Sequence, residues 1–125
     1  MSFAVFLGIG LLGGLGATAR FLLDEFVSAR DSSVFPAGIL TVNLLGAFAL
    51  GVLVGAAVHG DAHRLLATGL LGGFTTFSTW MLDSHRLHEH GHRREFWLNL
   101  AISLAAGLAG VTLASGLVRR LEAPA

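Results

Sequence analysis

Residues 65–82 read LLATGLLGGFTTFSTWML, a run that combines the hydrophobicity of a membrane span with a polar centre. Within this run, the segment 72–80, GGFTTFSTW, holds two glycines, three threonines and one serine. The paired glycines predict that the helix breaks there. Broken backbone at membrane depth is tolerated only where it is buried in protein or lines a wet or ion-bearing cavity. The segment is therefore either a packing seam or a functional site.

Three further apolar runs, at 3–27, 36–58 and 96–118, are each close to the length of a membrane-spanning helix. A soluble four-helix bundle needs a polar face on each helix, and none of these runs has one. With 54% hydrophobic residues, 13% charged residues and a mean hydropathy of +0.72, the chain is too apolar for a typical soluble domain. We predict an all-α membrane protein in which residues 1–125 form one domain of four transmembrane helices, the third broken in mid-membrane.

There is no lysine, and seven of the eight arginines are divided almost evenly between the two ends of this predicted bundle; Arg20, near the end of the first span, is assigned to neither end. The arginines of one end are Arg64, Arg119 and Arg120, and those of the other are Arg30, Arg86, Arg93 and Arg94. Because an excess of positive charge on cytoplasmic loops orients membrane proteins, so small a difference allows insertion both ways up. Two readings stay open: an antiparallel, dual-topology dimer, or a weak bias that still orients every copy one way.

The spans lack the groups on which several other functions depend. Their carboxylates, Asp24, Glu25, Asp83 and Glu95, all fall near span ends, whereas proton-coupled transporters generally need one inside the membrane. This disfavours a small multidrug-resistance-type transporter and removes the acidic rings of a selective cation channel. No nucleophile–base pair is visible, so we do not expect an enzyme. A net charge of zero argues against a nucleic-acid partner.

The candidate functional groups inside the spans are neutral donors and aromatic rings. They are Thr41, Asn43, Thr75, Thr76, Ser78, Thr79, Asn99 and Ser103, with Phe74, Phe77 and Trp80. A hydroxyl in a membrane helix often bonds back to the preceding turn, but a mid-span carboxamide is costly unless it bonds across helices or faces water. Aromatic edges carry partial positive charge, so rings beside donors can attract a small anion, although an aromatic stripe is also ordinary core packing. Carbonyls released by a helix break can coordinate a cation.

Three other features have competing interpretations. Arg20 could pair with Asp24 and form a cationic vestibule that gathers anions, or it could snorkel to the lipid headgroups. The histidines of the 85–92 loop could bind a metal or simply titrate in water. Small residues spaced four apart predict close helix packing. These pairs are Gly10/Gly14, Gly51/Gly55, Gly69/Gly73 and Ala106/Gly110.

Three motifs together resemble the Fluc (CrcB) family of fluoride channels: GGFTTFST at 72–79, LTVNLLGAFALG at 40–51 and GATARFLLD at 16–24. Size, four spans and balanced charge agree with the family across essentially the whole chain. The resemblance implies a passive, fluoride-selective channel that exports fluoride from the cytoplasm across a prokaryotic inner membrane. It also implies two pores at the interface of an antiparallel homodimer, with a structural sodium ion at the centre.

The resemblance further assigns roles to individual residues. Backbone carbonyls of Gly72 and Thr75 would hold the sodium ion, and Arg20 would lie in a vestibule. The fluoride pathway would be lined by Asn43, Phe77, Thr79, Trp80 and Ser103. Fluoride holds its water tightly, so its pathway must replace that water with closely spaced donors. Amide and hydroxyl groups of this set can supply them.

Two positions depart from the family pattern. Trp80 stands where a second phenylalanine is usual, adding bulk and an indole N–H donor, and Ile39 stands where a threonine usually contributes. An alternative therefore stays open, in which this chain conducts poorly alone and belongs to an obligate heteromeric channel with a paralogous subunit. A chain that only supports assembly, and a small coupled transporter, are the remaining alternatives.

Overall fold

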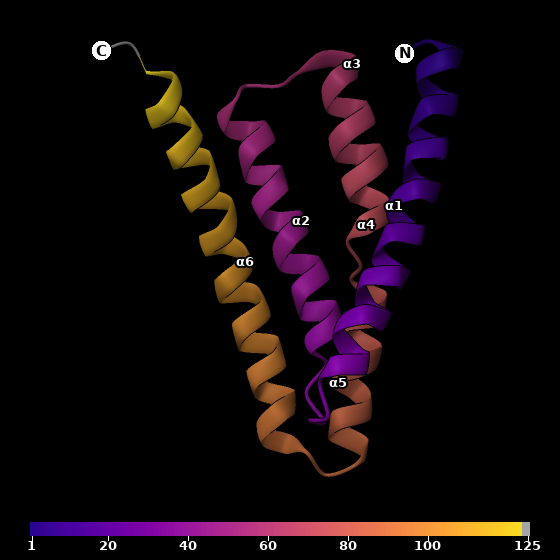
Figure 1. The fold of residues 1–125 in the computed structure, drawn as a ribbon, viewed down its shortest axis with the longest axis vertical. Coiled ribbons are helices and arrows are strands. Elements are labelled where there is room, and N and C mark those ends of the chain that lie inside the picture. The colour runs from indigo at the N-terminus through magenta and orange to yellow at the C-terminus, as the bar shows by residue number, and fades with distance from the viewer. Residues whose placement is uncertain (124–125) are drawn as a thin grey trace.

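The computed structural model describes residues 1–123, and over that range the chain is built from helices (Figure 1). Four segments are long and apolar enough to cross a membrane: Phe3–Arg30, Ala37–Gly55, Gly60–Glu89 and Arg93–Glu122. Three of them are the continuous helices α1 (Phe3–Arg30), α2 (Ala37–Gly55) and α6 (Arg93–Glu122). The prediction of a four-span α-helical protein is confirmed, whereas the single domain over residues 1–125 stays a prediction.

The third span is divided into several pieces. It begins with α3 (Gly60–His63), continues as the π-helical η1 (Arg64–Leu71) and the short α4 (Gly72–Phe74), and resumes as α5 (Ser78–Glu89). The chain leaves helical geometry at Thr75, where φ is −83° and ψ is 159°. The predicted mid-span break is thus present.

The position of the break differs from the one that the paired glycines predicted. Gly72 and Gly73 are helical, and the break covers residues 75–77. Gly73 serves close packing instead, because a Cβ atom there would collide with the carbonyl of Gly13 on α1. The glycines bring the helix end against its neighbour, and the hydroxyl-rich residues after them leave the helix.

Two seams of small residues hold the bundle together. In Figure 1, α2 lies in the middle, with α6 packed along one side and α1 crossing on the other, against η1 and α4. Gly51 and Gly55 meet α6 at Val111 and Ser115, as their spacing predicted. Gly69 meets α1 at Ile9, which also agrees.

The pair Gly10 and Gly14 on α1 makes no close contact within one chain, so the packing predicted for it stays a prediction. A Cβ on Gly10 or Gly14 would meet no described atom within 4 Å, so these glycines are not in a seam within one chain. Gly13 and Gly16 take the contact with η1 and α4. The choice among closely spaced glycines depends on the rotation of the helix about its axis, which the spacing alone does not fix.

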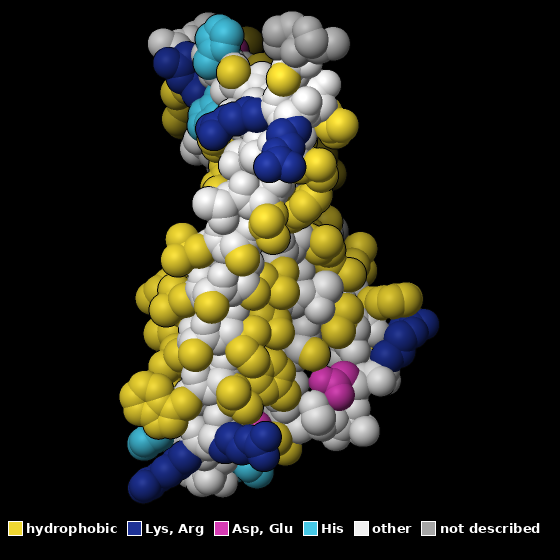
Figure 2. Space-filling view, turned by 90° about the vertical axis from the view of Figure 1, so that its left-hand side faces the viewer, with side chains coloured by type: hydrophobic (Ala, Val, Ile, Leu, Met, Phe, Trp, Pro, Cys, Tyr) yellow, Lys and Arg dark blue, Asp and Glu magenta, His cyan; other side chains and the backbone are white. Residues whose placement is uncertain are grey.

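The surface has the distribution expected of a chain in a bilayer. Figure 2 shows a hydrophobic middle, with arginine and histidine side chains gathered at the two ends. Large apolar side chains on α1 are exposed, among them Phe3, Phe6, Leu11 and Phe21. Positive charge therefore lies at both ends of the bundle, in keeping with the near-even arginine count.

Candidate functional site

A side chain from α2 forms hydrogen bonds with the backbone at the break in the third span. Asn43 Nδ2 donates to the Thr76 carbonyl at 3.0 Å, and Asn43 Oδ1 accepts from the Thr76 N–H at 3.0 Å. In an unbroken helix that N–H would bind the Gly72 carbonyl four residues earlier. The mid-span carboxamide is thus bonded across helices, and it supplies the backbone bonds that the helix gives up.

The second end of the break is organised by Thr76. Its Oγ1 accepts from the Thr79 N–H at 3.2 Å and lies 3.3 Å from Thr79 Oγ1, so it satisfies a donor at the start of α5. In a continuous helix that N–H would bind the Thr75 carbonyl. The carbonyls of Gly72 and Thr75 have therefore both lost their usual donors to side chains.

Arg20 reaches the break from α1. Its Nε donates to the Gly73 carbonyl at 3.3 Å, which satisfies another group that a continuous helix would bond internally. Gly16, one turn earlier, makes this approach possible, because a Cβ there would collide with the carbonyl of Leu70. Of the two readings of Arg20, the ion pair with Asp24 is not formed among the described residues, where Asp24 Oδ1 accepts from Ser28 Oγ at 3.2 Å.

The two aromatic residues after the break differ in environment. Phe77 is 69% exposed, whereas Trp80 is only 9% exposed. Their rings meet edge to face, with centroids 5.5 Å apart and planes at 78°. Trp80 Nε1 donates to the Asn99 carbonyl at 3.4 Å, so the extra donor that tryptophan brings already has an acceptor on α6.

A buried polar network connects α5 to α6 behind Trp80. Ser84 Oγ donates to the Trp80 carbonyl at 2.8 Å and accepts from Asn99 Nδ2 at 2.8 Å. Ser103 Oγ donates to Asn99 Oδ1 at 3.4 Å, which confirms that these two residues share a helix face. Sequence reasoning missed Ser84, and the available signal was its spacing of four from Trp80, one turn of helix.

Most of the predicted site residues meet in one groove of about 470 Å³ along the α2, α4–α5 and α6 side of the bundle. Its lining is otherwise mostly apolar, with Ala47, Leu50, Leu104 and Leu108 as examples. Arg20 and Thr79 are the two predicted residues that do not line it. The predicted residues that do are Asn43, Gly72, Thr75, Phe77, Trp80 and Ser103.

A family model described as CrcB-like protein, Camphor Resistance (CrcB), matches residues 7–115. The chain belongs to the CrcB family. The match includes every residue of the groove and of the break, and it confirms the resemblance carried by the three motifs. A CrcB chain with four apolar helices is a multi-pass membrane protein.

Curated relatives of this CrcB chain are named as channels. A protein of Mycobacterium tuberculosis strain H37Rv, "Fluoride-specific ion channel FluC 2", is 43% identical over 113 residues, covering 90% of each chain. A FluC 2 protein of Haloarcula marismortui is 44% identical over 111 residues, covering 89% of this chain and 91% of the relative. A FluC 1 protein of Rubrobacter xylanophilus is 47% identical over 96 residues. A family whose members are named as ion channels fits the expectation of a protein that is not an enzyme.

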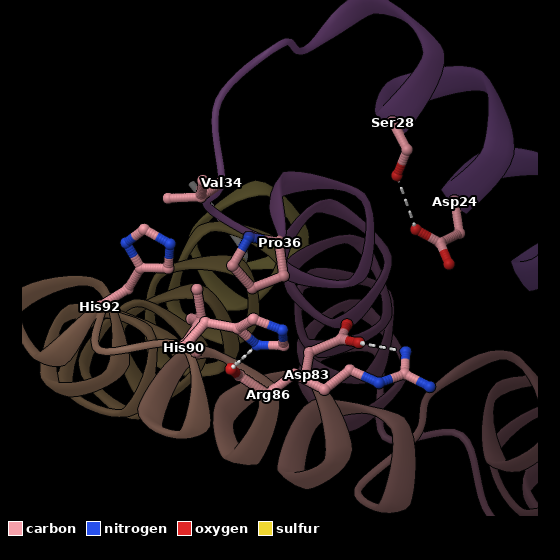
Figure 3. Close-up of a pocket in the computed structure, with 9 residues that line it drawn as sticks. Asp24, Ser28, Val34, Pro36, Asp83, Arg86, His90 and His92 are labelled. Atoms are coloured by element: carbon pink, nitrogen blue, oxygen red, sulfur yellow. Dashed lines mark hydrogen bonds and ion pairs between the residues drawn. The ribbon is translucent and has the colours of Figure 1, made fainter.

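A second pocket of about 470 Å³ lies where α1 ends and α5 runs beside the start of α2 (Figure 3). Its charges are mixed, because Asp83 lies 4.0 Å from Arg86, and His90 Nδ1 lies 2.7 Å from the Arg86 carbonyl. His85, on the same helix, pairs with Glu89 at 2.9 Å. Among residues 1–123, no three His, Cys, Asp or Glu side chains are arranged to hold a metal ion. Over that range, the metal interpretation of the histidine loop gains no support.

Proposed function

We propose that this protein is a passive, fluoride-selective ion channel that exports fluoride from the cytoplasm. The observation that carries the proposal is the helix break inside the groove, where Asn43, Phe77 and Ser103 surround backbone that has left the helix. The names of the relatives supply the ion, because the groove by itself indicates only a small anion or an ion-bearing cavity.

The pathway would run along the groove past donors and ring edges. Asn43 uses one amide proton on Thr76, and a carboxamide has a second one to offer. Ser103 holds its proton on Asn99 through a long 3.4 Å bond, so the hydroxyl can turn to a passing anion at small cost. Phe77, largely exposed, presents a ring whose edge is weakly positive. Such neutral groups can replace water around fluoride without trapping it as a full charge would.

A sodium ion would be held by the Gly72 and Thr75 carbonyls, each from one side of the break. Both residues line the groove, and the N–H groups that would normally bind their carbonyls donate to Asn43 and Thr76 instead. Carbonyl oxygens freed in this way are suitable ligands for a small hard cation. Such an ion would supply fixed positive charge beside the anion path.

The groove is open on one side, and we propose that a second, antiparallel copy of the chain covers it. Its α6 wall carries Gly107 between Leu104 and Leu108, a small residue that permits close approach of another helix. Two copies in opposite orientation would bring two pairs of carbonyls to one sodium ion and form two pathways. The near-even division of arginines permits both orientations in the inner membrane.

A paralogous subunit is the alternative partner, since relatives are named both FluC 1 and FluC 2. The departure at Ile39 gives this alternative little support. Ile39 is 3% exposed and is not among the described residues that line the groove, so a threonine there would add no donor to it.

The test is fluoride efflux from liposomes that contain the purified protein, followed with a fluoride electrode. We expect fluoride efflux that does not depend on a proton gradient, and no chloride efflux from matched liposomes. Equal chloride efflux, or flux that follows the pH gradient, would overturn the proposal. Flux that requires co-reconstitution with a paralogous chain would instead establish the heteromeric alternative.

A further inference from the structure

Asn99 is the centre of a closed set of hydrogen bonds around Trp80. Its side chain is 1% exposed, and both ends of the carboxamide are used, Nδ2 on Ser84 and Oδ1 on Ser103. Its backbone carbonyl accepts the Trp80 indole N–H. Ser84 closes the set, because the same hydroxyl that accepts from Asn99 donates to the Trp80 carbonyl. Trp80 is thus attached to α6 through its ring and, by way of Ser84, through its backbone.

Burying the carboxamide of Asn99 costs free energy, so packing alone does not account for an asparagine at this position. A buried carboxamide must have its hydrogen bonds, and an apolar side chain of similar volume fills the same space without that requirement. An apolar residue of α5, Leu87, is also buried, at 6% exposure, without any such hydrogen bond. The amide therefore adds a fixed geometry between the helices rather than burial.

That geometry decides where the largest side chain of the groove lies. Trp80 lines the groove, and its ring supports the exposed ring of Phe77 at 5.5 Å. An indole is bulkier than a phenyl ring, so an indole that left this position would obstruct more of the groove than a phenyl ring would. The 3.4 Å bond to the Asn99 carbonyl is long and holds the indole only while α5 and α6 keep their spacing.

We propose that Asn99 is a positioning residue for conduction: through Ser84 it fixes α5 to α6, and so holds the Trp80 ring against α6, where it lines the pathway without blocking it. The inference rests on the proposed function. It means that the bulk of Trp80 is compatible with an open groove because Asn99 restrains it.

The test combines Asn99→Leu and Trp80→Phe in one set of flux measurements. Asn99→Leu alone should lower fluoride flux about tenfold, the effect of losing one or two net hydrogen bonds that hold the ring. Trp80→Phe should rescue it, because a smaller ring needs no restraint, and the double variant should conduct like Trp80→Phe alone. Ser115→Ala is the control. It removes a different buried polar side chain of α6, the Ser115 hydroxyl, which bonds to the Thr112 carbonyl. It should leave flux unchanged.

A second measurement follows the ring without depending on flux. The chain has two tryptophans, so in a Trp97→Phe background the fluorescence of Trp80 can be read alone. Asn99→Leu should increase the quenching of Trp80 by acrylamide, and Ser115→Ala should not. If Asn99→Leu does not fold, Ser84→Ala removes the same link with a smaller change and should act in the same direction.

Two results would overturn the inference: Asn99→Leu with the flux and quenching of the unsubstituted protein, or a flux loss that Trp80→Phe does not rescue. The latter would place the effect on Ser103 or on packing. Absence of flux in the unsubstituted protein would overturn the proposed function instead, and the quenching of Trp80 would still decide whether Asn99 holds the ring.

Discussion

Both seams of the bundle use small residues to bring helices close together. They differ in whether the packed helices are continuous. At the α2–α6 seam, Gly51 and Gly55 let two continuous helices approach, and each helix satisfies its own backbone. At the seam of α1 with η1 and α4, Gly16 and Gly73 allow an equally close approach, but the helix ends there. Side chains from α1 and α2 then take over the backbone bonds.

This difference shows which features mark a site in a membrane protein. Glycine spacing indicates only that helices pack closely, because helix association in lipid depends on van der Waals contact. A polar side chain bonded to the backbone of another span reports that a helix has been interrupted, which lipid does not permit without compensation. Asn43 and Arg20 are the residues that distinguish the second seam from the first.

The largest effect is expected from Asn43→Leu, which removes both bonds to Thr76. Two half-buried backbone groups would lose their partners, at a cost of up to about 1–3 kcal/mol each. The break would close or distort, and fluoride efflux should fall to the level of empty liposomes, with a lower midpoint of thermal unfolding.

Thr41→Val is the control for Asn43→Leu on the same helix, because the Thr41 hydroxyl bonds back to the Ala37 carbonyl at 2.8 Å. It should keep both flux and unfolding midpoint. Normal flux in Asn43→Leu would show that the break does not need its cross-helix bonds, and the distinction between the seams would disappear.

Substitutions of the seam glycines should have the second-largest effect. Gly73→Ala and Gly55→Ala both introduce a Cβ into occupied space, against Gly13 and Ser115 respectively, and should each cost about 1–3 kcal/mol of stability. Only Gly73→Ala displaces the break, so only this variant should lose flux per folded protein, measured by efflux normalised to the main peak in size exclusion.

Gly14→Ala controls for the substitution itself within one chain, because no described atom lies within 4 Å of the added carbon. An unfolding midpoint that falls as far in Gly14→Ala as in Gly73→Ala would contradict the packing assigned to α1. Equal flux losses in Gly55→Ala and Gly73→Ala would show that both seams serve the pathway.

Arg20→Gln should have a smaller effect, a roughly tenfold loss of flux, the size expected from one hydrogen bond to a charged donor. A residue that caps the Gly73 carbonyl should give a loss independent of ionic strength. A residue that gathers anions electrostatically should give a loss that shrinks as salt is raised. Efflux measured over a series of salt concentrations therefore decides between the observed contact and the vestibule role.

Much of the fold was predictable, because membrane spans follow from length and hydrophobicity. Paired glycines beside a mid-span cluster of hydroxyl residues also indicated a helix break. The exact break was not predictable: Gly72 and Thr75 lie on opposite sides of a boundary that depends on which donors Asn43 and Thr76 capture. The contact of Thr76 with Thr79 is a local cap, but the contact of Asn43 with Thr76 joins residues 33 apart, and no local spacing encodes it. The network around Trp80 was missed for the same reason, since Ser84 gains its role only when α6 lies beside α5.

The smallest effect is expected from Trp80→Phe, which removes one hydrogen bond 3.4 Å long and some bulk from the groove. Folding should be preserved, with a stability loss of about 1 kcal/mol or less, because long hydrogen bonds contribute little net free energy. Flux should be retained or raised, since the phenyl ring still supports Phe77 and leaves more room. Complete loss of flux in a folded variant would mean that the indole N–H takes part in the pathway, and that its bond to the Asn99 carbonyl is exchanged for fluoride as the ion passes.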